Sequence, residues 1–147
     1  MIKHLWSIAC SRTSVDKESN NISLFEVLEQ LTLSGGPIQP QPGKKGVVPI
    51  LFEIVSLWTK EHENETIKGR GRTVLVAPSG TELPMVEFDV DLSQHQRSRT
   101  INRITGLPIG EEGKHYFRVD LQENGRWAEQ GRVPLQIVFK AEGAAAA

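Results

Sequence analysis

The feature that most constrains this chain is an Asn-Gly turn between two segments of alternating polarity near the C-terminal end. Residues 113–123 precede Asn124-Gly125, and residues 126–139 follow it. Asn and Gly both accept the positive φ of a tight hairpin turn, and period-two alternation indicates a strand with one buried face. The side chains expected on that face are Phe117, Val119, Leu121, Val133, Leu135, Ile137 and Phe139, with Arg118 and Asp120 facing solvent. Residues 113–139 therefore predict an antiparallel hairpin.

Six further segments have the composition of strands and are separated by turn signals. They are residues 2–10, 22–33, 47–60, 67–77, 85–92 and 98–105. We expect 47–60 to be the longest strand and a central one, because apolar side chains occupy both of its phases. Seven or eight short strands, with a turn roughly every ten residues, predict an all-β fold and favour an antiparallel sandwich over a barrel.

One segment is locally ambiguous between strand and helix. In residues 22–33, Ser23 and Glu26 match a capping box, and the leucines that follow could form a helical stripe. A strand is favoured, because the rest of the chain is β and a lone helix would need an apolar surface of its own.

The hairpin around residues 78–81 has two possible registers. A turn centred between Gly80 and Thr81 would place Arg72 opposite Asp89 and Arg70 opposite Asp91, giving ion pairs on the solvent face. A shift of one residue would instead turn the valines of the first strand inward, and sequence alone does not choose between the two.

Length and composition predict one domain in a reducing compartment. We expect residues 1–141 to form a single β-sandwich domain, with a Pro/Gly-rich loop at 34–46 and a disordered or vector-derived tail at 142–147. With 17 basic and 18 acidic side chains the net charge is −1, so nucleic acid and membranes are not expected partners. Cys10 is the single cysteine and excludes an internal disulfide. The sequence has no secretory signal pattern and no apolar run of membrane length, so we expect a cytoplasmic protein.

Several blocks of the sequence resemble an uncharacterised bacterial family of small immunoglobulin-like β-sandwich proteins, a domain-of-unknown-function family. The blocks are residues 6–10, 15–24, 27–31, 52–58, the turn at 78–80 and 113–139. The resemblance implies an immunoglobulin-like sandwich whose first two segments form a hairpin, which supports a strand at 22–33. It implies no activity, since fold does not determine function.

Residue types suited to catalysis are present, but not in the required spacing. The four histidines, on separate segments, are His4, His62, His95 and His115. Only residues 61–63 resemble a local ligand cluster, and they lie in a charged turn. The serines and aspartate at 11–16 lack a nucleophile elbow, Cys10 has no basic neighbour, and the Gly-Arg-Gly-Arg at 69–72 lacks the Lys-Ser/Thr of a P-loop. We therefore predict no catalytic, cofactor-binding or metal-binding residue, and no enzyme.

Basic and aromatic side chains supply the candidate contact residues. Basic residues that alternate along two segments are Lys68, Arg70, Arg72, Arg97, Arg99 and Arg103. They could form a stripe if the two strands meet, although pairing with the acidic residues at 87–91 is the simpler interpretation. We expect Trp6 and Trp58 in the core and Trp127 at an exposed contact. The predicted partner-binding residues are Trp127, Arg70, Arg72 and Arg99.

These patterns favour a non-catalytic cytoplasmic interaction or scaffold module. Its partner would be an unknown protein or a second copy joined through an edge strand, because edge strands offer unpaired backbone groups. An alternative is a ligand-binding sandwich in which Trp127 and nearby loops hold a glycan or peptide. An enzyme would require two or more histidines to converge with Glu61, Glu63 or Asp16 in a pocket.

Overall fold

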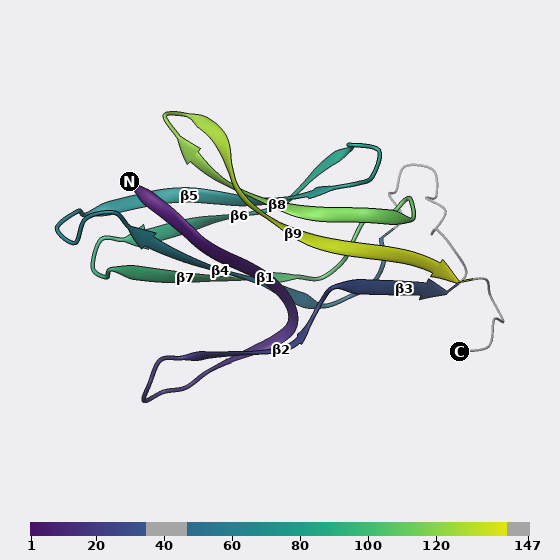
Figure 1. Ribbon diagram of the computed structural model, residues 1–147, viewed down its shortest axis with the longest axis horizontal. Coiled ribbons are helices and arrows are strands. Elements are labelled where there is room, and N and C mark those ends of the chain that lie inside the picture. The colour runs from purple at the N-terminus through teal and green to yellow at the C-terminus, as the bar shows by residue number, and fades with distance from the viewer. Residues whose placement is uncertain (35–46, 141–147) are drawn as a thin grey trace.

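The computed structural model describes residues 1–34 and 47–140, which form nine β-strands and no helix (Figure 1). The strands are β1 Ile2–Val15, β2 Ile22–Val27, β3 Gln30–Ser34, β4 Phe52–Lys60, β5 Ile67–Val76, β6 Glu82–Leu92, β7 Arg97–Ile104, β8 Gly113–Glu123 and β9 Arg126–Lys140. The all-β prediction is confirmed. The nine strands in the described residues exceed the seven or eight that we expected.

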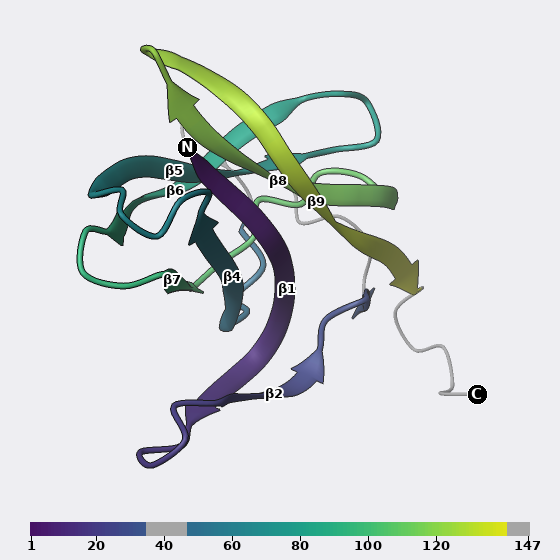
Figure 2. The same cartoon turned by 60° about the vertical axis from the view of Figure 1, so that its left-hand side comes forward.

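The strands form two sheets that lie one above the other in a sandwich-like arrangement (Figures 1 and 2). Sheet A has the order β2-β1-β4-β7, and sheet B has the order β3-β9-β8-β5-β6. All the strand pairs are antiparallel except β3 with β9, which is parallel. The expectation of an entirely antiparallel arrangement therefore fails at this one pair.

The parallel pair exists because residues 22–33 divide between the two sheets. Glu26 has a φ of 52°, and Leu28 N donates to the Ala9 carbonyl where β2 ends. The chain then crosses to sheet B, where Gln136 N donates to the Glu29 carbonyl and β3 follows β9. The preference for strand over helix was right, but the segment is two strands rather than one.

The core lies between the sheets and is filled by alternate residues of the central strands. Its largest fully buried side chains include Trp58, Phe52, Phe117, Ile54, Leu75, Leu92, Leu107, Ile109, Leu135 and Ile137. The loop between β7 and β8 supplies Leu107 and Ile109, so the predicted Pro/Gly turn also closes one side of the core. The prediction that Trp58 is a core residue is confirmed, and its Nε1 donates to Thr100 Oγ1 at 3.0 Å.

The closing hairpin forms as predicted. Asn124 and Gly125 have φ values of 51° and 77°, as a tight hairpin turn requires. A bulge leaves Gln130 without a direct partner between the pairs Val119 with Gly131 and Asp120 with Glu129. The prediction that Asp120 faces open solvent is wrong, because two arginines cover it and it is buried.

The segment 47–60 is central but is not the longest strand. β4 begins at Phe52 and is buried along both faces between β1 and β7, whereas β9, with 15 residues, is longer. Pro49 has no N–H to donate to a ladder, and Val48 forms only an isolated bridge with Leu107. The expected strand is therefore shortened at its beginning.

The β5–β6 hairpin keeps the expected faces but pairs two residues away from the expected register. Arg70 lies opposite Asp89, and Arg72 lies opposite Glu87. The turn closes where Ala77 N donates to the Thr81 carbonyl, which is earlier than we expected. Met85 is then an extra residue in β6, between the partners of Thr73 and Val74.

Two sequence predictions lie outside the described residues: the loop over 35–46 and the tail at 142–147. Within the described ranges, no helix is long and apolar enough to cross a membrane.

Candidate functional site

The β1–β2 hairpin forms an arm that folds back beneath sheet A. We define the arm as residues 11–27. β1 pairs with β4 as far as Cys10 and thereafter only with β2. Figures 1 and 2 show β1 bending so that the arm lies on the side of sheet A away from sheet B. The arm is thus a third, partial layer below the sandwich.

The tip of the arm is organised by one carboxylate. Asp16 Oδ1 accepts hydrogen bonds from Glu18 N at 2.9 Å and Ser19 N at 2.8 Å. Asp16 N also donates to the Asn21 carbonyl, and Asn20 takes a left-handed φ of 61°. Short Asx side chains favour such turns because they bond to the local backbone. The hydrogen bonds from Ser19 and Glu18 lower the pKa of Asp16.

A groove of about 660 Å³ separates the arm tip from sheet A. It is lined by Trp6, Ser19, Asn20, Asn21, Ile22, Leu57, His95, Arg97, Ser98 and Arg99. The volume lies within the roughly 300–1,000 Å³ typical of ligand sites. We call this space the arm groove.

The part of the arm groove formed by sheet A follows from strand register. Trp6 in β1 pairs with Leu57 in β4, and Leu57 pairs with Arg99 in β7. Paired residues share a face, so these three side chains form one row across sheet A on the face away from the core. Trp6 reaches this face because a bulge makes Leu5 an extra residue of β1. The expectation that Trp6 lies in the core is therefore wrong: it is half-buried and lines the arm groove.

The basic residues of the arm groove lack carboxylate partners. Neither Arg97 nor Arg99 forms an ion pair with any residue in the described ranges 1–34 and 47–140. Arg99 Nη2 donates to the Asn20 carbonyl at 2.9 Å, and its Nε has no hydrogen-bond partner although it is inaccessible to solvent. The groove thus combines an apolar strip with uncompensated positive charge.

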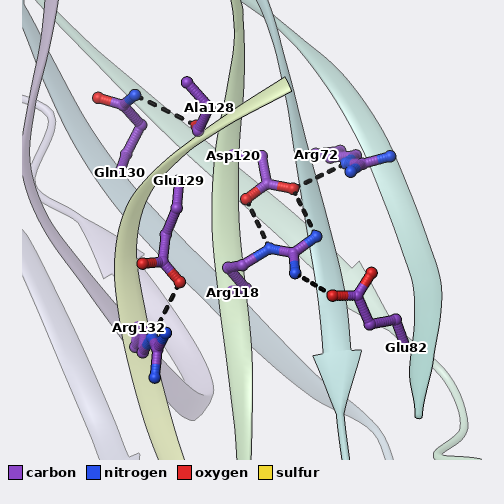
Figure 3. Close-up of polar contacts among 8 residues, drawn as sticks. All are labelled: Arg72, Glu82, Arg118, Asp120, Ala128, Glu129, Gln130 and Arg132. Atoms are coloured by element: carbon purple, nitrogen blue, oxygen red, sulfur yellow. Dashed lines mark hydrogen bonds and ion pairs between the residues drawn. The ribbon is translucent and has the colours of Figure 1, made fainter. Parts of the chain in front are cut away.

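The outer face of sheet B carries a different set of arginines, which are paired (Figure 3). Asp120 accepts from Arg72 at 2.8 Å and from Arg118 at 2.8 and 3.1 Å, and Arg118 also reaches Glu82. These carboxylates raise the pKa of Arg118 further, Asp120 contributing most. The Asp120 side chain is 2% exposed.

The predicted contact residues on sheet B are engaged with one another or with neighbouring acids. The Arg72 guanidinium lies 4.5 Å from the centre of the Trp127 ring, and Arg70 pairs with Glu87 and Asp89 at 2.9 Å each. One face of the Trp127 ring is thus occupied by an arginine. We call this set of paired residues the sheet B network.

The structure separates the predicted basic stripe into two surfaces. The members on β5 face the acidic residues of β6, while Arg97, Arg99 and Arg103 lie on sheet A. Arg103 is 3.8 Å from Glu53. Of the four predicted partner-binding residues, the structure brings Arg72 and Trp127 together, places Arg70 beside acidic partners, and places Arg99 in the arm groove.

A small polar cluster lies between β1 and β4. His4 Nε2 and Ser7 Oγ are 2.7 Å apart, and Ser7 Oγ and Ser56 Oγ are 2.6 Å apart. The His4 ring packs against Trp58, and burial lowers the pKa of His4. The side-chain partner of this imidazole is the Ser7 hydroxyl, and among the described residues no carboxylate orients the ring as in a catalytic triad.

The remaining catalytic candidates do not form a site in the described part of the chain. No group of three His, Cys, Asp or Glu side chains there could hold a metal ion. Cys10 is buried, and burial is the largest cause of its raised pKa, which disfavours the reactive thiolate. The residues at 69–72 lie within β5, where Gly71 packs against the Phe88 ring.

Comparisons with known proteins do not identify a family. Neither a family model nor a curated protein sequence matches the chain. Among solved structures, the N-terminal domain of PorA aligns over 94% of this chain and 100% of its own, with a TM-score of 0.30 and 13% identity.

Proposed function

We propose that the protein is a non-catalytic interaction module that holds an extended segment of a partner protein in the arm groove. The observation that carries this proposal is a groove with an apolar strip and two arginines that have no carboxylate partner in the described ranges. Apolar contact supplies affinity at such a site, and a few polar groups fix orientation and specificity.

The shape of the arm groove favours an extended chain as its occupant. Residues of sheet A line one side of the groove, and residues of the arm tip line the other. Strand side chains alternate between faces, so a segment in β conformation can present one row to Trp6 and Leu57 and the opposite row to the arm. The arm lies beside the segment and need not unfold to admit it.

Self-association through β2 is a second candidate, supported by the exposure of that edge. In the described ranges β2 pairs with β1 alone, and its Phe25 and Val27 side chains are 40% and 51% exposed. By contrast β6, an edge strand of sheet B, is protected by Pro84 and a series of acidic side chains, a common defence against edge pairing. Light scattering of wild type and Val27→Lys over a concentration series tests this: a dimer that Val27→Lys disrupts supports the candidate.

We also propose a cytoplasmic location, as the sequence analysis favoured, and an immunoglobulin-like variant of the β-sandwich, as the family resemblance implied. The buried free thiol of Cys10 is compatible with a reducing compartment. Two packed sheets of mainly antiparallel strands are compatible with that fold, although β3 runs parallel to β9.

The experiment is affinity capture of the tagged protein from the lysate of its source cell, analysed by mass spectrometry against a tag-only control. Trp6→Ala should lose the captured partner, because Trp6 lines the arm groove. Arg97→Glu should lose it too, whereas Arg126→Glu, the same charge change at the exposed β8–β9 turn, should keep it. A stoichiometric partner that all three variants retain would place the interaction elsewhere and reject the arm groove.

A further inference from the structure

The N–H donors of the Arg99 guanidinium are incompletely paired in this structure. It offers five N–H donors in a planar fork that matches a carboxylate. Its one partner among the described residues is the Asn20 carbonyl, bound through Nη2, and its Nε has none. A buried, unpaired N–H of a charged group costs stability. An acceptor supplied by a ligand would therefore remove that cost.

The arm tip is attached to β7 by this same contact. Between the arm and β4 there is a hydrogen bond from Thr13 Oγ1 to Glu53 Oε2 at 2.8 Å, close to where the arm begins. The turn at the tip is held internally by hydrogen bonds to Asp16, which do not depend on the contact with β7. One hydrogen bond to a neutral carbonyl is weaker than a two-point bond to a carboxylate.

Strand register places Arg99 beside an apolar strip. Trp6, Leu57 and Arg99 occupy one row on adjacent strands, which are about 4.8 Å apart. In an extended segment, side chains two residues apart share a face and are separated by roughly 6.6 Å. One such pair can therefore place an apolar side chain on Trp6 and Leu57 and an acidic one at Arg99.

We propose that Arg99 determines the specificity of the arm groove by exchanging the Asn20 carbonyl for an Asp or Glu carboxylate of the bound segment. This rests on the proposed function. The segment would carry an apolar side chain and an acidic side chain two residues apart. Binding then releases the arm tip from β7, and the carboxylate of the segment takes the place of the Asn20 carbonyl as the hydrogen-bond acceptor of Arg99.

The test begins with random linear 12-residue peptides displayed on phage and selected on the immobilised protein. We expect the selected sequences to share an apolar residue and an acidic residue two positions apart. Synthetic peptides from the selection are then measured by fluorescence polarisation, each with a matched version in which Glu is replaced by Gln or Asp by Asn. The protein variants are Arg99→Gln, Arg99→Lys and Trp6→Ala, each checked by circular dichroism and thermal melting.

The decisive measurement is a double-mutant cycle between Arg99 and the peptide acid. The amide peptide and Arg99→Gln should each weaken binding about tenfold, and together no more than either alone, because both remove one charge-assisted contact. Arg99→Lys should retain part of the affinity as a point charge without the planar fork. If the two changes multiply, Arg99 does not contact the acid and the inference is rejected.

The outcomes separate this inference from the proposed function. Peptides that need Trp6 but carry no acid, or whose acid is independent of Arg99, would leave the arm groove as the binding site and overturn the role of Arg99. Peptide binding that Trp6→Ala leaves unchanged, or a failure to select any peptide, would overturn both. Binding of a single-stranded oligonucleotide that requires Trp6 and Arg99, without acidic peptides, would replace the protein partner with a nucleic acid.

Discussion

The outer faces of the two sheets use the same residue type in opposite ways. On sheet B, arginines on β5 and β8 contact carboxylates at 2.8 to 2.9 Å, and Asp120 lies buried between two of them. On sheet A, Arg97 and Arg99 line the arm groove without a carboxylate partner among the described residues. The arginines of the sheet B network are held by carboxylates within the fold, whereas Arg97 and Arg99 on sheet A have no such partner among the described residues.

The difference teaches how to choose a candidate surface in a chain with balanced charge. A net charge of −1 does not show how the charges are distributed. Where each cation has an acid within reach, the surface is already neutral and attracts little. Where cations line a groove beside an apolar strip and have no such acids, a partner of complementary charge can supply them.

The largest expected effect distinguishes a buried carboxylate from an exposed one on the same sheet. Asp120→Asn keeps the shape of the side chain but leaves Arg72 and Arg118 without their shared charge, so it should destabilise the fold by about 3 kcal/mol. Asp89→Asn is the matched control, because Asp89 pairs with Arg70 but its side chain is 82% exposed. We expect it to change stability by less than about 0.5 kcal/mol. Urea unfolding measures the free energy of unfolding of both variants. An equal decrease in the two would show that Asp120 is not the residue that stabilises the sheet B network.

The second effect compares one tryptophan from each face. Trp127→Ala removes the ring beside Arg72 and should lower the free energy of unfolding by about 2 kcal/mol, with peptide binding unchanged. Trp6→Ala should cost about 1 kcal/mol of stability, because Trp6 is half-buried at a groove, and should abolish binding. Thermal melting and fluorescence polarisation together check this reversal. A loss of binding on Trp127→Ala, with the fold intact, would return Trp127 to the candidate site.

A smaller effect compares one arginine from each face. Arg99→Gln removes a guanidinium that is incompletely satisfied, so the free energy of unfolding should change by no more than about 0.5 kcal/mol. Arg118→Gln leaves Asp120 with one of its two arginines and should cost about 2 kcal/mol. Urea unfolding of both variants under the same conditions gives the comparison. A large loss for Arg99→Gln would make Arg99 a structural residue.

Local patterns in the sequence predicted those parts of the fold that depend on neighbouring residues. The hairpin at 113–139 was recognisable because Asn124-Gly125 fixes the turn and alternation fixes the face. The buried position of Asp120 was missed because Arg72 reaches it from β5, 48 residues away in the chain. The β5–β6 register was missed because the extra residue Met85 has no local signal.

The arm groove could be predicted only in part. Arg99 was a candidate, and the turn-forming residues at 16–21 were recognised, but nothing local indicates that the arm folds back under sheet A. Trp6 and Leu57 meet through pairing between β1 and β4, after a bulge at Leu5 changes the face of Trp6. A prediction based on strict alternation cannot detect a bulge that changes the face of the following residue, so Trp6 was wrongly predicted to lie in the core.

The smallest expected effect concerns the pH dependence of the arm tip. The pKa of Asp16 is lowered from 3.8 by hydrogen bonds from Ser19 and Glu18, so the ionised form stabilises the closed tip. That contribution is fully present above the unfolded value and is lost as pH falls through the lower folded value. Amide hydrogen exchange by NMR should therefore show faster opening at Glu18 and Ser19 as the pH falls below about 4, relative to the intrinsic rate at each pH.

A matched carboxylate on sheet B provides the control for that pH dependence. The pKa of Asp91 is also lowered, by hydrogen bonds from Ser93, but both residues lie outside the arm at residues 11–27. Asp16→Asn should remove the acid-induced opening at Glu18 and Ser19, since an amide can still accept their hydrogen bonds but does not titrate. Asp91→Asn should leave it in place. If the acid-induced opening persists in Asp16→Asn, it does not come from titration of this carboxylate, and the prediction is wrong.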